Sequence, residues 1–142
     1  MFAVSTHARY ALRALQYIAD HQDEGYISIA RIAEDEQISK KYLENIFKLL
    51  KRGDLVRSVR GPEGGYVLAK DPRDISLWDI VTAAGGEVLT AECIETPEVC
   101  ERHGSCGSKD IWGELQRHIE RFLQERSLES GGNAGGKNGI HG

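Results

Sequence analysis

The 142-residue sequence lacks the features that would place a protein in or beyond a membrane. It has no run near the roughly 18 apolar residues that a membrane span needs, so we expect no membrane partner. Its first residues, Met1 to His7, do not have the basic-then-apolar order of a signal peptide. We therefore expect a cytoplasmic protein.

Cysteine is scarce and odd in number, with Cys93, Cys100 and Cys106 only. Disulfides are rare in a reducing compartment, so we first interpret these residues as metal ligands or reactive thiols. The rest of the composition is globular, with 40% apolar and 28% charged residues, which excludes a disordered or collagen-like chain. The length fits one domain, or a small domain with an appended element.

An overall positive charge is also missing, since the formal net charge is −4 and this argues mildly against nucleic acid as a partner. The charge is unevenly spread, however. Residues 1–75 carry 12 basic and 11 acidic residues, whereas residues 76–142 carry 6 and 11. Residues 39–62 alone carry seven basic and two acidic residues. Such a stripe is what a phosphate backbone attracts, although on charge alone a solvated helix face explains it equally well.

Apolar spacing predicts three helices in the first half of the chain. Apolar residues recur at helical intervals over about 5–21, 28–36 and 39–53. Ser28 and Ser39 are N-cap candidates for the second and third helices, and the third should end near residue 53, where a glycine stands. Two short helices joined by a few residues, the second of them basic, are typical of a helix-turn-helix.

A β-hairpin is predicted directly after these helices. Residues 55–60 and 66–69 have strand character, and the glycine- and proline-rich segment 61–65 between them has the composition of a turn. A helix-turn-helix followed by a hairpin is a winged helix. The expected fold class is therefore mainly α with a small β-hairpin, and residues 1–75 form a winged helix-turn-helix DNA-binding domain.

The second half of the chain divides into three expected segments. Residues 76–107 contain a connecting helix, capped by Ser76 and ended by two glycines, and a loop that bears the cysteines. Residues 108–128 form a last long helix, which Ser108 is expected to cap. Residues 129–142 form a flexible tail, because six glycines fall among the last 13 residues without any apolar period.

The last helix is predicted to carry an apolar stripe that needs a partner surface. The stripe consists of Ile111, Leu115, Ile119 and Phe122, flanked by Trp112 and Leu123. We interpret it as a dimerisation helix, which makes the protein a homodimer. The alternative is that the helix packs onto its own domain.

Several motifs resemble one family of regulators. Ser5-Thr6, Arg9 to Leu15, Tyr42-Leu43-Glu44 and the string from Ser58 to Tyr66 are similar to the IscR/NsrR/CymR family of bacterial winged-helix repressors. The string SVRGPEGGY is specific to this family, whereas the helix pattern alone is not. The resemblance runs from Met1 to about Phe122. It implies a transcription repressor that binds double-stranded DNA at a roughly palindromic operator.

The start of the third helix is the predicted reading element, because a recognition helix places its N-terminal residues in the major groove. Ser39, Lys40 and Lys41 can reach base edges or phosphates, and the hydroxyl of Tyr42 can donate to a phosphate. The resemblance suggests that Glu44 affects which sites are accepted. For Lys48, contact with the DNA backbone and a solvated face remain alternatives.

The hairpin turn and the first helix complete the predicted DNA interface. Arg60 stands at the wing tip, where an arginine can enter a narrow minor groove. Gly61 and Pro62 let the backbone approach DNA closely. Arg9 is a candidate phosphate contact, because helix N-termini attract anions. Tyr66 is interpreted as a strand residue that packs on the core.

The three cysteines lie close enough in sequence to converge on one metal centre. Their spacing, Cys93-x6-Cys100-x5-Cys106, is neither the paired pattern of a zinc ribbon nor a ferredoxin pattern. Chemistry alone favours a metal or cluster over redox thiols. The resemblance implies an iron–sulfur cluster, with 2Fe–2S favoured and 4Fe–4S possible, although close relatives often have five residues between the first two cysteines.

The fourth ligand of such a cluster stays open. Relatives with a 2Fe–2S cluster use a histidine where this chain has Lys109, and relatives with a 4Fe–4S cluster use an aspartate where it has Arg9. His103 and His7 are the remaining candidates on chemical grounds. Solvent or a small thiol is equally open.

The resulting hypothesis is a homodimeric, sequence-specific regulator whose cluster senses iron supply or redox and nitrosative stress. One alternative is a cluster-free regulator controlled by thiols or by a partner. A second is a zinc-stabilised adaptor that binds protein. An enzyme is not expected, because no Ser/His/Asp grouping, phosphate loop or paired-carboxylate site stands out.

Overall fold

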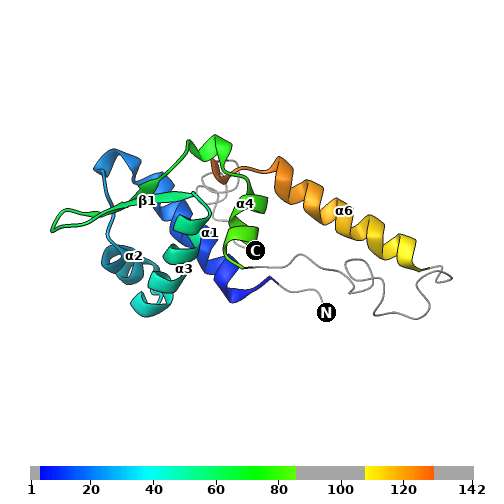
Figure 1. The fold of residues 1–142 in the computed structure, drawn as a ribbon, viewed down its shortest axis with the longest axis horizontal. Helices are drawn as coiled ribbons and strands as arrows, with labels where there is room; N and C mark the ends of the chain where they lie inside the picture. The colour runs from blue at the N-terminus through cyan, green and yellow to red at the C-terminus, as the bar shows by residue number, and fades with distance from the viewer. Residues whose placement is uncertain (1–3, 86–107, 130–142) are drawn as a thin grey trace.

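The computed structural model describes residues 4–85 and 108–129 and is mainly helical with a two-stranded antiparallel hairpin, as the sequence predicts (Figure 1). The cysteine-bearing loop and the tail from residue 130 lie outside these residues. The elements follow the order α1 (Thr6–Asp20), η1 (Gln22–Glu24), α2 (Ile29–Glu36), α3 (Lys40–Arg52), β1 (Val56–Val59), β2 (Gly65–Leu68), η2 (Pro72–Asp74), α4 (Leu77–Ala83) and α6 (Lys109–Glu125).

Serine caps set the starts of most helices. In α1, α2, α3 and α4 the hydroxyl of the N-cap serine accepts a hydrogen bond from a backbone N–H three residues later; these serines are Ser5, Ser28, Ser39 and Ser76. This confirms the predicted caps at Ser28, Ser39 and Ser76. Ser108 stands at the N-cap of α6, but its side chain makes no capping bond. Its backbone is already helical, whereas a capping residue has an extended backbone.

Helix α1 lies at the centre of the core. Small residues on its buried face, among them Ala11 and Ala14, let neighbouring elements approach closely, and Leu15 and Ile18 fill the space beside them. Elements α2, α3, α4 and β2 all pack against α1. The aromatic ring of Phe47 in α3 is fully buried in the same cluster. The helix predicted over about residues 5–21 is therefore confirmed, and a wide face of it is buried.

The two hairpin strands pair in antiparallel register. A further backbone segment, which sequence reasoning missed, pairs with β2. Val56 faces Leu68 at one end of the register, and Val59 faces Gly65 at the other. Ile27, which precedes α2, exchanges both backbone hydrogen bonds with Tyr66, at 3.0 and 2.8 Å. Gly65 has a φ of +151°, and a Cβ there would lie 2.4 Å from the Ile27 carbonyl oxygen. Only glycine permits this close approach.

Helix α6 extends away from the winged-helix part, with its first turn at the far end, and the residues that follow the helix pair with the core (Figure 1). We call residues 126–129 the C-terminal strap. Its backbone pairs with the segment before α4: the N–H of Leu77 donates to Arg126 at 2.9 Å, and that of Leu128 donates to Ile75 at 2.8 Å. The helix ends at Glu125, earlier than the predicted residue 128, because the backbone of Arg126 is extended to make this pairing.

Candidate DNA-binding surface

Helix α3 has one buried face and one charged face. Leu43, Ile46, Phe47 and Leu50 are fully buried at helical spacing. The opposite face carries exposed side chains that include four predicted DNA-binding residues, namely Lys40, Lys41, Glu44 and Lys48. Packing against the core thus leaves these four residues on the surface.

The turn between α2 and α3 fixes the direction in which α3 leaves. Gln37 ends α2 with a left-handed backbone, φ +54°. The backbone N–H of Ile38 donates to the Ala33 carbonyl at 3.0 Å, and the Ile38 side chain is buried. Ser39 follows as the cap of α3, with its hydroxyl 3.3 Å from the Tyr42 nitrogen. Ser39 is therefore exposed and also determines where the helix begins.

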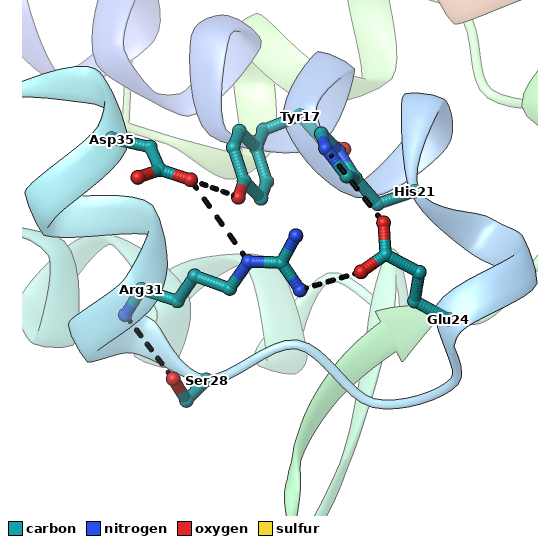
Figure 2. A network of polar contacts seen from close by, with 6 residues as sticks. All are labelled: Tyr17, His21, Glu24, Ser28, Arg31 and Asp35. Carbon is teal, nitrogen blue, oxygen red and sulfur yellow. Dashed lines mark hydrogen bonds and ion pairs between the residues drawn. The ribbon is translucent and has the colours of Figure 1, made fainter.

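A polar cluster ties α2 to the end of α1 (Figure 2). The Arg31 guanidinium forms an ion pair with Glu24 at 2.8 Å, lies 3.9 Å from Asp35 and stands over the ring of Tyr17. The Tyr17 hydroxyl donates to Asp35. The hydrogen bond from Arg31 lowers the pKa of Glu24, while burial and the bond to Asp35 raise the pKa of Tyr17. These contacts hold the first helix of the helix-turn-helix in place.

A second contact secures the other end of α2. The Arg13 side chain of α1 pairs with the Glu36 carboxylate at 3.2 Å and also donates to the Glu36 backbone carbonyl. A cation at a helix C-terminus is favourable, because the last carbonyls lack partners within the helix. Helix α2 is therefore attached to α1 at both of its ends.

Tyr42 faces α1. Its hydroxyl, predicted to meet a phosphate, lies 3.1 Å from Nδ1 of His7, and the two rings are 4.8 Å apart. The ring of Tyr10 meets that of Tyr42 edge-on at 5.5 Å. Arg9 stands beside this group on α1, exposed, with a hydrogen bond to Thr6 at 3.2 Å and its guanidinium 5.8 Å from the Tyr10 ring. The starts of α1 and α3 therefore lie together.

The hairpin turn carries the remaining predicted residues, which are exposed: Arg60, Gly61 and Pro62. Gly61 has a φ of +121°, and its carbonyl accepts from Gly64 at 3.0 Å. A Cβ at Gly64 would lie 2.1 Å from the Val59 carbonyl oxygen, so the tight turn itself requires glycine there. The glycines of this tight turn therefore place the exposed arginine at the end of the hairpin.

The hairpin is attached directly to α3. The ring of Tyr66 packs against that of Phe47 at 4.6 Å, which confirms the interpretation of Tyr66 as a packing residue. Lys51 of α3 donates from Nζ to the Ser58 hydroxyl of β1 at 2.9 Å. The hairpin and α3 therefore form one unit.

Sequence reasoning assigned no individual role to two surface residues that lie in this region. Asn45 is exposed on α3 between the turns that bear Lys41 and Lys48, and Arg57 is exposed on β1. The four-residue step from Lys41 identifies Asn45 as a member of the same face. Arg57 is one of the seven basic residues in the stripe over 39–62. The His7–Tyr42 contact left no such signal, because its partners are 35 residues apart.

The proposed cluster ligands are described only in part. Cys93, Cys100, Cys106 and His103 lie outside the described residues, while His7 is the α1 residue that contacts Tyr42. Within residues 4–85 and 108–129, no grouping of His, Cys, Asp and Glu could hold a metal ion. Nor does any helix in those two ranges have the length and apolar character to cross a membrane.

The chain is similar to known regulators over most of its length. It is 36% identical over 125 residues to the HTH-type transcriptional regulator IscR of Serratia proteamaculans, covering 88% of this chain and 76% of that protein. With the IscR of Photorhabdus laumondii it shares 36% identity over 126 residues, 89% of this chain and 76% of the relative.

Solved structures give the same picture. CymR, the global cysteine regulator of B. subtilis, matches with a TM-score of 0.77 at 30% identity, over 92% of this chain and 95% of that one. T. potens IscR matches with a TM-score of 0.73 at 32% identity, over 91% and 85%. The resemblance found in the sequence is confirmed. Residues 4–130 match the model of the Rrf2 family, described as an iron-dependent transcriptional regulator. The chain therefore belongs to the Rrf2 family of transcriptional regulators.

Proposed function

We propose that this protein is a homodimeric repressor in the cytoplasm that binds a roughly palindromic DNA operator under the control of an iron–sulfur cluster. The observation that carries the DNA-binding part is the charged face of α3, held in one unit with the wing. The proposed DNA-binding surface consists of the residues predicted from the sequence, which lie on α1, on α3 and its cap, and in the hairpin turn: Arg9, Ser39, Lys40, Lys41, Tyr42, Glu44, Lys48, Arg60, Gly61 and Pro62.

The shape and charge of this unit suit duplex DNA. An α-helix fits the major groove, where Ser39 and Lys41 at the start of α3 can reach base edges. Lys40 and Lys48 can neutralise phosphates beside the groove. Arg60 extends from a turn kept narrow by glycines, which suits the minor groove. Glu44 is the acidic member of this face and can accept a hydrogen bond from a cytosine amino group.

Exposed apolar side chains on α6 support dimerisation through that helix. Ile111 and Phe122 are 62% and 51% exposed, and Trp112 is exposed as well. Side chains of this size in one stripe are typical of a surface that a second chain covers. A second copy related by two-fold symmetry would present two recognition helices, which is why the expected operator is roughly palindromic.

The donor set fits an iron–sulfur cluster. Three cysteine thiolates within 14 residues are the ligand type that iron–sulfur clusters take. When bound, such a cluster supplies reversible electron transfer and a centre that reacts with oxidants. Cys93, Cys100 and Cys106 would hold it. His7 can serve as a fourth ligand only through the ring nitrogen that does not bond Tyr42, so its Nε2 is the atom at issue.

The test uses the full chain purified without oxygen. We expect about two iron and two sulfide per chain for a 2Fe–2S cluster, visible absorption bands, and loss of both in a variant with all three cysteines changed to alanine. Binding to a duplex selected from a random-sequence pool should differ between the loaded and cluster-free forms at fixed salt. Equal binding would contradict cluster control and favour the thiol- or partner-controlled regulator, whereas one zinc without sulfide would favour the adaptor.

A further inference from the structure

The first residues of α3 are joined to the start of α1 through Tyr42. Lys40 and Lys41 are exposed, whereas Tyr42 is half-buried. The fully buried residues of α3 begin only at Leu43. The first backbone N–H groups of a helix lack partners within the helix, so this turn depends on its cap and on the contacts of Tyr42.

Those contacts come from the start of α1. The hydroxyl of Tyr42 shares a hydrogen bond of 3.1 Å with Nδ1 of His7, whose ring lies 4.8 Å from that of Tyr42. Tyr10 adds an edge-on contact at 5.5 Å, and Arg9 and Arg13 both lie within 6 Å of the Tyr10 ring centre. His7 is therefore the polar partner that determines where the Tyr42 hydroxyl points.

We propose that His7 is a positioning residue for the recognition helix. By holding the Tyr42 hydroxyl, it fixes the orientation of the α3 turn that carries Lys40 and Lys41 relative to the start of α1. Tyr42 then contributes to operator selection by this internal contact and makes no phosphate contact of its own. The inference rests on the proposed DNA-binding function, because it concerns how the same surface distinguishes one DNA sequence from another.

Four variants of the full chain separate the parts of this contact. Tyr42→Phe removes the hydroxyl, and His7→Phe keeps a ring in place but removes Nδ1. The double variant combines them. His7→Asn restores a polar atom near the position of Nδ1. Tyr26→Phe is the matched control, since it removes a hydroxyl from an exposed tyrosine outside this contact.

The probes are a duplex selected from a random-sequence pool by the wild-type protein and a scrambled duplex of equal length. We expect Tyr42→Phe and His7→Phe each to weaken binding to the selected duplex by about 3- to 10-fold, the range that one hydrogen bond supplies. Binding to the scrambled duplex should not change, and the double variant should be no weaker than either single variant. His7→Asn should recover most of the loss.

Three results would overturn the inference. The fold-losses in affinity of the two single variants could multiply in the double variant, which would show that the two residues act independently. Both duplexes could lose affinity equally. The slope of log K against log salt could fall by about one in Tyr42→Phe, which would indicate a direct phosphate contact. If the wild-type protein selects no sequence from the pool, the proposed function itself fails, and this inference falls with it. Circular dichroism of each variant establishes that it is folded.

Discussion

The winged-helix part of the chain buries its large apolar side chains, whereas α6 leaves several of its own exposed. Leu15 and Phe47 are fully buried among α1, α3 and the hairpin. On α6, Ile111 and Phe122 are more than half exposed, although their spacing is just as regular. A regular apolar stripe therefore predicts a helix that needs a covering surface, but it does not say whether that surface belongs to the same chain.

The C-terminal strap joins α6 to the winged-helix part. It follows α6 in the sequence, yet Leu128 is 1% exposed inside the winged-helix core. The strap is hydrogen-bonded on both sides of Ser76, through Ile75 and Leu77. Arg73 adds a contact of 3.8 Å to Glu129. One end of α6 is thus attached to the winged-helix part, while two residues of its apolar stripe, Ile111 and Phe122, stay exposed.

The largest expected effect is on the free energy of unfolding, when a phenylalanine is changed to alanine in each region in turn. Phe47→Ala removes a fully buried ring and should lower the free energy of unfolding by about 3–5 kcal/mol, because it deletes packing and leaves a cavity. Phe122→Ala should change the stability of the single chain by less than about 1 kcal/mol. Urea denaturation at low protein concentration measures both.

The second readout of this pair is the oligomeric state. Phe122→Ala should weaken self-association in sedimentation equilibrium. Phe47→Ala leaves the α6 surface intact, so under conditions in which it stays folded it should associate as the wild type does. Equal destabilisation by the two substitutions would contradict the contrast between the regions, because it would place Phe122 in the core of its own chain.

The strap tests how firmly the two regions are joined. Leu128→Ala should lower the free energy of unfolding by about 2–4 kcal/mol, since a fully buried leucine is truncated. Leu123→Ala, on a half-buried residue of α6, is the matched control and should cost less. Proteolysis should also cleave after α6 more readily in Leu128→Ala. A loss no larger than that of the control would mean that the strap does not hold α6 to the core.

Removing one positive charge from each region tests which region contacts DNA. Lys41→Ala should weaken binding to the selected duplex by roughly 1–3 kcal/mol if the lysine reads a base. Arg117→Ala removes an exposed cation from α6 and should leave affinity unchanged. Fluorescence anisotropy at fixed salt measures both. No loss in Lys41→Ala at low salt would remove that residue from the interface.

The smallest effect is the pH dependence of the polar cluster around Arg31. The pKa of Glu24 is lowered from its ordinary value of 4.5 by the bond to Arg31, so the carboxylate form is favoured in the folded state. The pair therefore adds stability above about pH 4.5, and this is lost as the pH falls through the lowered pKa. Glu24→Gln should be less stable than the wild type at pH 7 and equal to it in acid.

The check is urea denaturation across that pH range, repeated at high salt. Salt should shrink the difference at pH 7, because the pair is exposed and screened. A difference that persists in acid would show that the substitution acts through shape or packing and that the ion pair is not its cause.

Most of the local structure could be predicted from the sequence. Ser28, Ser39 and Ser76 cap the helices that they were expected to cap, and the hairpin strands lie within one or two residues of their predicted bounds. These signals are short in range, since a cap bonds a backbone group three residues away and an apolar stripe repeats every three or four residues. The exposure of Lys41 and Lys48 follows from the same period.

The DNA-binding residues stay a prediction, although the structure leaves most of them exposed. The sequence predicted a phosphate contact for Tyr42 and gave no sign that its hydroxyl lies beside His7. The cysteine ligands stay a prediction, because Cys93, Cys100 and Cys106 lie outside the described residues. Nothing in the local sequence around His7 indicates a partner 35 residues away, since either ring could bond any nearby polar group.

The sequence by itself determined the class of the fold, the bounds of α1, α2 and α3 to within about one residue, and the face of α3 that meets solvent. Only the tertiary structure decided that Ile27 pairs with Tyr66, that His7 holds Tyr42 and that Leu128 returns to the core. Backbone N–H and C=O groups are alike in almost every residue, and a leucine is equally apolar in any core. The local sequence therefore does not identify the distant partners of such groups, which are determined only when the whole chain packs.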